Sequence, residues 1–216
     1  MRVFKMKDME KKYMSFHARL WARSIIWTVG AKVEIRGLKN IPKNQPICFV
    51  SNHQSGLDIP LIMGYVYPAV GFIAKKELRY IPILSSWMNV LHCIFINRKS
   101  ARESLEAVNK GVEYIKQGFP ILIFPEGTRS RSNKMAPFKS GSLKLAMRSK
   151  AHIIPITVSG SYKLREERKG IITPGRVKIT VHPPVDTSAL EDEDTKEVAA
   201  RLWNTIHSAL ESKQPG

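Results

Sequence analysis

Short apolar runs alternate with helix-like stretches along most of this chain, and that alternation limits the fold more than any other feature. Strands that alternate with helices along a chain usually form one sheet, in which helices connect successive strands. We therefore predict an α/β domain with a mixed sheet flanked by helices. The expected strands span residues 32–36, 47–51, 71–75, 93–98, 121–125, 153–158 and 176–182. The expected helices span residues 60–67, 77–90, 100–117, 142–148 and about 194–212.

Residues 1–30 have the pattern of an amphipathic helix in front of a main domain, residues 31–216. Apolar side chains recur at intervals of three and four, and basic residues lie away from that line. A basic helix with Trp and Phe on its apolar face is typical of helices in the headgroup layer of an anionic membrane. The alternative is an ordinary helix packed on the main domain. The apolar line is Met6, Met9, Tyr13, Phe16, Leu20 and Trp27, widened by Trp21, Ile25 and Ile26, and the basic residues are Lys5, Lys7, Lys11, Lys12, Arg19 and Arg23.

The charge of the chain predicts polyanionic partners. Lys and Arg number 35 against 18 Asp and Glu, a net charge of +17, which suits nucleic acid, an anionic bilayer or a phosphorylated substrate. No helix-turn-helix pattern, zinc spacing or RNP-type aromatic motif supports nucleic acid. Basic residues interrupt every long apolar stretch, so no membrane-spanning helix is expected. Cys48 and Cys93 lie in apolar runs, which predicts reduced core thiols in a cytosol-facing protein.

His53 and Asp58 form the first candidate site. They follow a buried-looking strand, and Pro60 suits the first turn of a new helix. On a regular helix their spacing of five would set the two side chains about 140° apart, so they can meet only if His53 lies in a turn before the helix. There, Asp58 would fix the imidazole tautomer and stabilise the cation formed when His53 accepts a proton. Taken alone, such a pair is more often a capping Asp beside a structural His.

A second polar cluster follows the predicted strand at residues 121–125. Its glycine lets a ligand approach the backbone, its arginine offers two parallel N–H groups to a phosphate, and its hydroxyls supply further donors. Two polar turns at strand ends predict one shared cleft. Lys75 and Arg98 also end predicted strands, where a basic residue is usually only solvated. The cluster reads Phe124, Pro125, Glu126, Gly127, Thr128, Arg129 and Ser130.

The order of these motifs resembles the glycerolipid acyltransferase family, and within it the bacterial 1-acylglycerol-3-phosphate acyltransferases. The resemblance covers residues 31–190. It rests on Asn-His-x4-Asp, a strand ending in Arg98, the Phe-Pro-Glu-Gly-Thr-Arg-Ser cluster and an Ile-Pro-Ile strand at residues 154–156. It implies a mostly parallel sheet flanked by helices, with residues 1–30 docked on a membrane and residues 31–216 as the catalytic domain.

The same resemblance implies a role for each candidate residue. His53 would act as general base and Asp58 would orient it. Arg98 and Arg129, with Lys75 as a weaker candidate, would bind the phosphate of the acceptor. The acceptor site would be shaped by Glu126, Gly127, Thr128 and Ser130.

The reaction implied by the resemblance moves a fatty acyl group from acyl-CoA or acyl carrier protein to the sn-2 hydroxyl of 1-acyl-sn-glycerol 3-phosphate. The product is phosphatidic acid, made at the cytoplasmic face of the inner membrane. No metal or cofactor is expected, because the thioester is already activated. A covalent acyl-enzyme is not expected either, because there is no GxSxG elbow and Cys48 lies inside a strand. Backbone N–H groups near residues 59–61 are the expected donors to the oxyanion.

Three other functions fit parts of the sequence. The first is an acyltransferase for another acceptor, such as glycerol 3-phosphate or a different lysophospholipid. The second is a hydrolase in which His53 and Asp58 activate water on a thioester. The third is a non-catalytic basic module that binds membranes or nucleic acid, suggested by the net charge.

Overall fold

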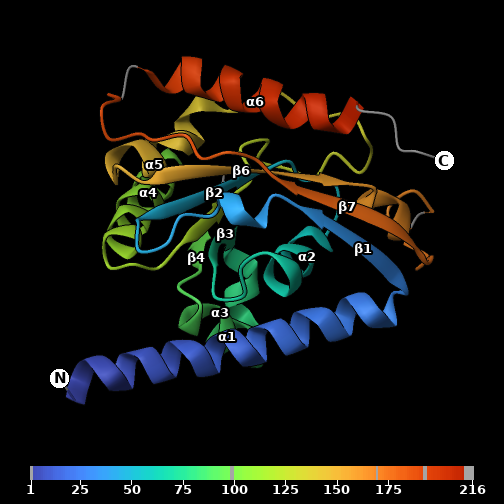
Figure 1. Cartoon of the computed structure of the whole chain (residues 1–216), viewed down its shortest axis with the longest axis horizontal. Coiled ribbons are helices and arrows are strands. Elements are labelled where there is room, and N and C mark those ends of the chain that lie inside the picture. The colour runs from blue at the N-terminus through green and yellow to red at the C-terminus, as the bar shows by residue number, and fades with distance from the viewer. Residues whose placement is uncertain (1, 98–99, 169, 192–193, 212–216) are drawn as a thin grey trace.

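The computed structural model describes residues 2–97, 100–168, 170–191 and 194–211. A seven-stranded sheet crosses the middle of the protein, with helices on both sides of it (Figure 1). The spatial order is β1-β7-β6-β2-β5-β3-β4, and every neighbouring pair is parallel except β6 with β7. The predicted α/β fold with a mixed, mostly parallel sheet is therefore confirmed. The strands are β1 (Ala31–Arg36), β2 (Ile47–Ser51), β3 (Gly71–Lys75), β4 (Ile94–Ile96), β5 (Ile121–Ile123), β6 (His152–Ser159) and β7 (Gly175–Val181).

The helices follow the predicted order, with one break. The predicted helix at residues 77–90 is divided at Pro82, because a proline keeps the residue before it out of the helical region. Ile81 is extended, with φ −94° and ψ 102°, and it separates a 3₁₀ turn (Lys76–Tyr80) from a regular helix. The helices are α1 (Arg2–Thr28), α2 (Asp58–Tyr65), α3 (Pro82–Val90), α4 (Ala101–Lys116), α5 (Lys144–Arg148) and α6 (Thr195–Glu211).

The two faces of the sheet bury separate groups of side chains. Successive residues of a strand point to opposite faces, so β2 contributes Phe49 to one core and Cys48 and Val50 to the other. The first core also contains residues of α1, α2 and α3, and the second contains residues of α4, α5 and α6. Both cysteines are buried and free, and burial raises the pKa of the Cys93 thiol to about 12.

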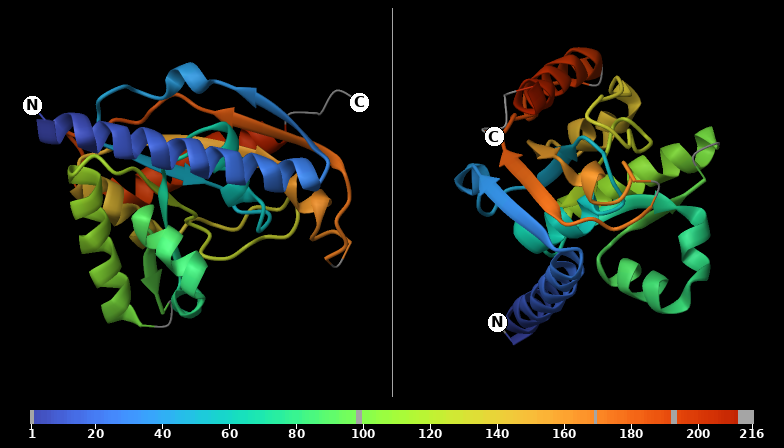
Figure 2. Two further views of the ribbon diagram at one scale, coloured as in Figure 1. Left: turned by 90° about the horizontal axis from the view of Figure 1, so that it is seen from below. Right: turned by 90° about the vertical axis from the view of Figure 1, so that its right-hand side faces the viewer.

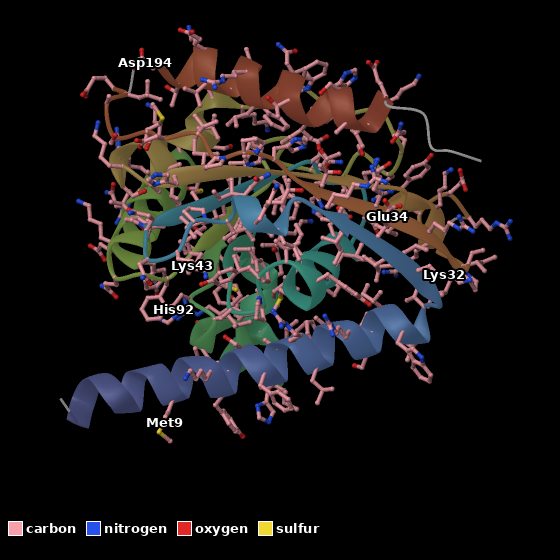
Figure 3. All side chains as sticks on the ribbon, viewed as in Figure 1. Met9, Lys32, Glu34, Lys43, His92 and Asp194 are labelled. Atoms are coloured by element: carbon pink, nitrogen blue, oxygen red, sulfur yellow. The ribbon has the colours of Figure 1, made fainter. Side chains whose placement is uncertain are left out.

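Helix α1 packs on the domain through small side chains and turns its large apolar side chains outward. Ala18, Ala22 and Ile26 are buried on one side of the helix. Ile26 was predicted to widen the outer apolar line, and that prediction was wrong, because it points into the core. On the opposite side Met9, Tyr13, Phe16, Leu20 and Trp27 are 59% to 80% exposed. Figure 3 shows Met9 pointing away from the domain.

Part of the predicted amphipathic pattern falls on side chains at the start of α1 that the structure does not describe. The side chains of Met6, Lys5, Lys7 and Lys11 lie outside the described part of the protein. Within the described residues, no helix is both long enough and apolar enough to cross a bilayer.

The sheet topology gathers the ends of several strands at one edge. Strands β6, β2, β5, β3 and β4 run in the same direction, so their carboxyl ends meet there. Loops at this edge of a parallel sheet are the usual place for ligand sites in open α/β folds. The loops that follow β2, β5 and β6 are therefore expected to form a ligand site.

Candidate active site

The loop after β2 is locked to the end of β6. Asn52, which is 1% exposed, accepts a hydrogen bond from the Val158 backbone N–H at 2.8 Å and donates one to the Val158 carbonyl at 2.9 Å. Two hydrogen bonds to one backbone residue fix both the position and the orientation of the amide. The chain therefore leaves β2 in a fixed direction, with His53 as the next residue.

His53 contacts Asp58 across a tight turn, as the spacing required. Asp58 is the first residue of α2, and His53 Nδ1 lies 2.8 Å from its Oδ2. The same oxygen accepts hydrogen bonds from the backbone N–H groups of Gln54 at 2.7 Å and Ser55 at 2.8 Å. The whole turn is thus wrapped around one fully buried carboxylate oxygen. Position at the start of a helix also favours a negative charge there.

The imidazole ring of His53 is held in a defined plane, and one of its two nitrogens is not used in the contact with Asp58. Its ring stacks on Phe124, with centroids 4.0 Å apart and 18° between the planes. When Nδ1 donates to Asp58, the second nitrogen, Nε2, keeps its lone pair and can accept a proton. The side chain is 13% exposed, so a small part of the ring remains open to a substrate.

Glu126 ties three segments together. It is 3% exposed, and its Oε1 accepts from the His53 backbone N–H at 2.7 Å, while its Oε2 accepts from the Ala136 N–H at 2.9 Å. Ala136 in turn accepts a hydrogen bond from the indole N–H of Trp203 on α6 at 3.0 Å. Burial raises the pKa of Glu126, and the two backbone donors oppose that rise. Glu126 therefore shapes the site by holding the backbone of His53 in place.

The rest of the cluster after β5 divides into internal and exposed groups. The Ser130 N–H donates to the His53 carbonyl at 2.8 Å, and its hydroxyl donates to the Ser132 carbonyl at 2.9 Å. Gly127 has φ 73°, and a Cβ at this position would lie 3.0 Å from Lys139 Nζ. Thr128 and Arg129 are exposed. Ser130 thus fastens this loop to the one carrying His53.

Arg129 lines a basic pocket of about 460 Å³. The pocket is bounded by Arg129, Arg131, Arg165, Glu166 and Gly170. Glu166 Oε1 accepts from the Gly56 N–H at 3.0 Å and lies 3.9 Å from Arg129 Nη1, so the pocket adjoins the turn that carries Asp58. Three arginines around one cavity suit a phosphate group.

The structure describes only one of the other two predicted phosphate ligands. Lys75 is exposed at the end of β3, where it pairs with Ile96 of β4, and it does not line the cavity that holds Arg129. Arg98 lies outside the described residues. Of the N–H groups expected to face the oxyanion, that of Leu61 is not available, because it donates to the Leu57 carbonyl at 2.9 Å within the helix.

Further polar residues of the site were missed from the sequence. Ser161, after β6, donates its hydroxyl to Asp58 Oδ1 at 2.5 Å. The side-chain oxygen of Gln54 accepts from the Gly160 N–H at 3.0 Å, and its amide nitrogen donates to Asn133 at 3.1 Å. The sequence offered one signal, that Ser161 follows the predicted strand at residues 153–158, but the pairing of that strand with β2 is seen only in the structure.

Comparisons with known proteins place this chain in a family. A profile of the acyltransferase family matches residues 32–159. The chain is 33% identical to a chloroplastic 1-acyl-sn-glycerol-3-phosphate acyltransferase of Brassica napus, over 89% of this chain and 57% of the relative. It is 33% identical to the 1-acyl-sn-glycerol-3-phosphate acyltransferase of Saccharomyces cerevisiae, over 84% of this chain and 61% of the relative. It thus spans less than two thirds of the length of these two relatives.

A solved structure of an acyltransferase is also similar to this chain. The crystal structure of 1-acyl-sn-glycerophosphate acyltransferase from Thermotoga maritima has a TM-score of 0.86 and 30% identity, covering 97% of this chain and 85% of that one. The fold and the matched segment define an α/β acyltransferase. This chain belongs to the acyltransferase family, as the order of its motifs predicted.

Proposed function

We propose that this protein transfers a fatty acyl group from a thioester donor to the sn-2 hydroxyl of 1-acyl-sn-glycerol 3-phosphate, giving phosphatidic acid. The observation that carries the proposal is the 2.8 Å contact between His53 and buried Asp58, which leaves Nε2 as a base. The names of the relatives from Brassica napus and Saccharomyces cerevisiae support the choice of acceptor. Acyl-CoA and acyl carrier protein are both candidate donors.

In the proposed mechanism His53 acts directly on the acceptor. Nε2 removes the proton from the sn-2 hydroxyl while that oxygen attacks the thioester carbonyl carbon. Asp58 stabilises the imidazolium that forms. The new C–O bond then replaces the C–S bond, and the leaving thiolate takes the proton from the imidazolium. The reaction needs no metal or cofactor, because the thioester supplies the activated acyl group.

The basic pocket is the proposed site for the acceptor phosphate. Arg129 offers a planar fork of N–H groups, and its loop is fastened to His53 through the Ser130 N–H. A phosphate held there would restrict the hydroxyl of the same molecule to the neighbourhood of the base, and such positioning lowers a barrier by several kcal/mol. Lys75 and Arg98 remain proposed as secondary phosphate ligands. Thr128, which is exposed beside Arg129, remains a proposed donor to the acceptor.

An apolar groove is the proposed site for an acyl chain. It has a volume of about 430 Å³ and runs between α1 and α3. It is lined by Trp21 of α1, Ile83 and Trp87 of α3, and Ile59 and Met63 of α2. Ile59 directly follows Asp58 in the chain, so the groove and the catalytic pair share helix α2.

We propose that the same side of the protein rests on an anionic membrane, at the cytoplasmic face of the inner membrane. The exposed apolar line of α1 is accompanied by Tyr80, Ile83 and Val90 near α3, which are 46% to 80% exposed. In the right-hand view of Figure 2, α1 and α3 both lie at the lower side of the molecule. Exposed aromatic and aliphatic groups on a strongly basic protein favour an anionic bilayer surface.

The proposed reaction is tested by following a labelled acyl group. Wild-type protein is expected to convert lysophosphatidic acid to phosphatidic acid with acyl-CoA, with acyl carrier protein as donor, or with both. Glycerol 3-phosphate and other lysophospholipids serve as competing acceptors. Release of free fatty acid without any acceptor, and no phosphatidic acid with one, would indicate a hydrolase and contradict the proposal.

The membrane proposal predicts that two charges on α1 reduce binding. Phe16 and Trp27 are 64% and 80% exposed, so Phe16→Glu with Trp27→Glu should leave the fold intact and remove apolar contact with lipid. We expect flotation with anionic liposomes to fall several-fold. Point changes are preferable to deletion of residues 1–28, because Ala18, Ala22 and Ile26 belong to the core.

A matched control for this test lies on α4. Leu105 is 54% exposed on a different helix, and Leu105→Glu should leave flotation unchanged. Equal flotation of the α1 double variant and the wild type would contradict the membrane role of this surface.

A further inference from the structure

The carboxylate of Asp58 has a partner on each oxygen, and the two partners come from different parts of the chain. Oδ2 accepts three hydrogen bonds, all from its own turn. Oδ1 accepts from the hydroxyl of Ser161, which is 103 residues further along the chain. Both residues are 0% exposed. The Ser161 hydroxyl therefore decides how the second oxygen of the carboxylate is satisfied.

The chain around Ser161 is built to deliver this hydroxyl. Strand β6 ends at Ser159, and Gly160 turns the chain with φ 90°, a conformation that favours glycine. The Gly160 N–H donates to the Gln54 side chain at 3.0 Å, and Gln54 lies beside His53. Together with the pair of bonds between Asn52 and Val158, this contact holds the end of β6 against the turn of the catalytic pair.

We propose that Ser161 is a positioning residue for the His53–Asp58 pair. Its hydroxyl fixes the rotation of the Asp58 carboxylate, so that Oδ2 stays in line with His53 Nδ1. It also stabilises the negative charge of a carboxylate that has no access to water. The proposal rests on the proposed function, in which His53 is the base.

Loss of the hydroxyl has two physical consequences. A carboxylate rotates easily about its last torsion angle, so the imidazole loses part of its orientation. A buried anion that lacks one donor is also less stable, so the pair retains a proton to higher pH. The other charged groups near the pair are Glu126, Arg129 and Glu166. No hydrogen bond or ion pair joins any of these three to Ser161, whose hydroxyl donates to Asp58 and lies 3.4 Å from the Gln54 side-chain oxygen, so they remain common to the variant and the wild type.

The test compares Ser161→Ala with Ser161→Thr, which keeps the hydroxyl. The values of kcat and KM for lysophosphatidic acid and for palmitoyl-CoA are measured from about pH 6 to about pH 9, around the range in which imidazole titrates. Near pH 6 we expect kcat of Ser161→Ala to fall about tenfold, as for a lost hydrogen bond to a charged group, with both KM values nearly unchanged. The acid limb of the profile should move up by about one pH unit. Ser161→Thr should restore most of kcat and the position of the limb.

Two further variants separate the possible failures. Ser149 is another buried serine, whose hydroxyl donates to the Ala146 carbonyl at 3.0 Å, so Ser149→Ala controls for a general loss of packing. His53→Ala reports on the proposed function itself. If Ser161→Ala has the kcat and pH profile of the wild type while His53→Ala is inactive, the role of Ser161 is overturned and the proposed function stands. If folded His53→Ala is fully active, the proposed mechanism fails.

The remaining outcomes also decide the role of Ser161. Equal losses in folded Ser161→Ala and Ser161→Thr would show that the hydroxyl is not responsible, and would overturn the proposal. If Ser161→Ala does not fold, Ser161→Cys keeps the shape and offers only a weak S–H donor. A wild-type pH profile in Ser161→Cys would then overturn the proposal, and a limb displaced to higher pH would support it.

Discussion

Replacing His53 by alanine is expected to abolish acyl transfer while the protein stays folded. The expected loss of kcat is on the order of 10³-fold to 10⁴-fold, the upper part of the range for a general base. The change removes the nitrogen that accepts the hydroxyl proton. It leaves the Asp58 carboxylate with its two backbone donors and Ser161, so the turn keeps most of its hydrogen bonds. The measurement is transfer of labelled acyl groups to lysophosphatidic acid at saturating substrate, with circular dichroism to check folding.

His92 provides a matched control for this experiment. It is also a histidine stacked on a phenylalanine, with its ring centroid 3.6 Å from that of Phe119, against 4.0 Å for His53 and Phe124. It precedes β4 and therefore lies toward the opposite edge of the sheet from the candidate site. His92→Ala should keep kcat close to the wild-type value. A folded His53→Ala protein with more than about a tenth of wild-type turnover would contradict the assignment of His53 as the base.

The second large effect is expected at the phosphate of the acceptor. Arg129→Ala should lower kcat/KM for lysophosphatidic acid by about 30-fold, the size expected for a lost charge-assisted contact, mainly through a higher KM. The KM of the acyl donor should change little, because the proposed role of Arg129 concerns the acceptor alone. Arg129→Lys keeps the charge and loses the planar fork, so its kcat/KM should fall between those of Arg129→Ala and the wild type.

The control for Arg129 is an arginine with similar chemistry away from the site. Arg36 ends β1 at the opposite edge of the sheet and pairs with Glu34 at 2.7 Å, and Arg36→Ala should leave both KM values unchanged. An Arg129→Ala protein whose donor KM rises while its acceptor KM stays constant would move Arg129 to the donor site and contradict the proposed role.

Much of the sheet could be predicted because strand signals are local. The predicted strands at residues 47–51 and 71–75 coincide with β2 and β3, since a buried parallel strand is a continuous apolar run with polar residues after it. The break of the predicted helix at Pro82 shows where a local rule was overlooked. The orientation of α1 was harder to predict, because its line of large apolar residues and its line of small residues lie on opposite sides of the helix. Only the neighbouring α2 decides which of the two is buried.

In the candidate site, too, contacts within one turn could be predicted, and contacts between distant segments could not. The contact of His53 with Asp58 could be inferred, because both lie in one turn whose geometry the spacing restricts. Ser161 and Glu166 could not be assigned, because their contacts with Asp58 and Gly56 depend on how β6 packs beside β2. Glu126 was expected to shape the acceptor site, and its hydrogen bonds to two backbone N–H groups could be seen only after folding.

The hydrogen bonds of Glu126 also connect helix α6 to the backbone of His53. From Trp203 on α6, contacts run through Ala136 and Glu126 to the backbone of His53. Each link is a single hydrogen bond, and the first and last of them join segments that are far apart in sequence. Displacement of α6, by a substitution at Trp203 or by a partner bound along that helix, would therefore reach the base without any contact with a substrate. Helix α6 therefore helps to hold His53 in position, although the two are far apart in the sequence.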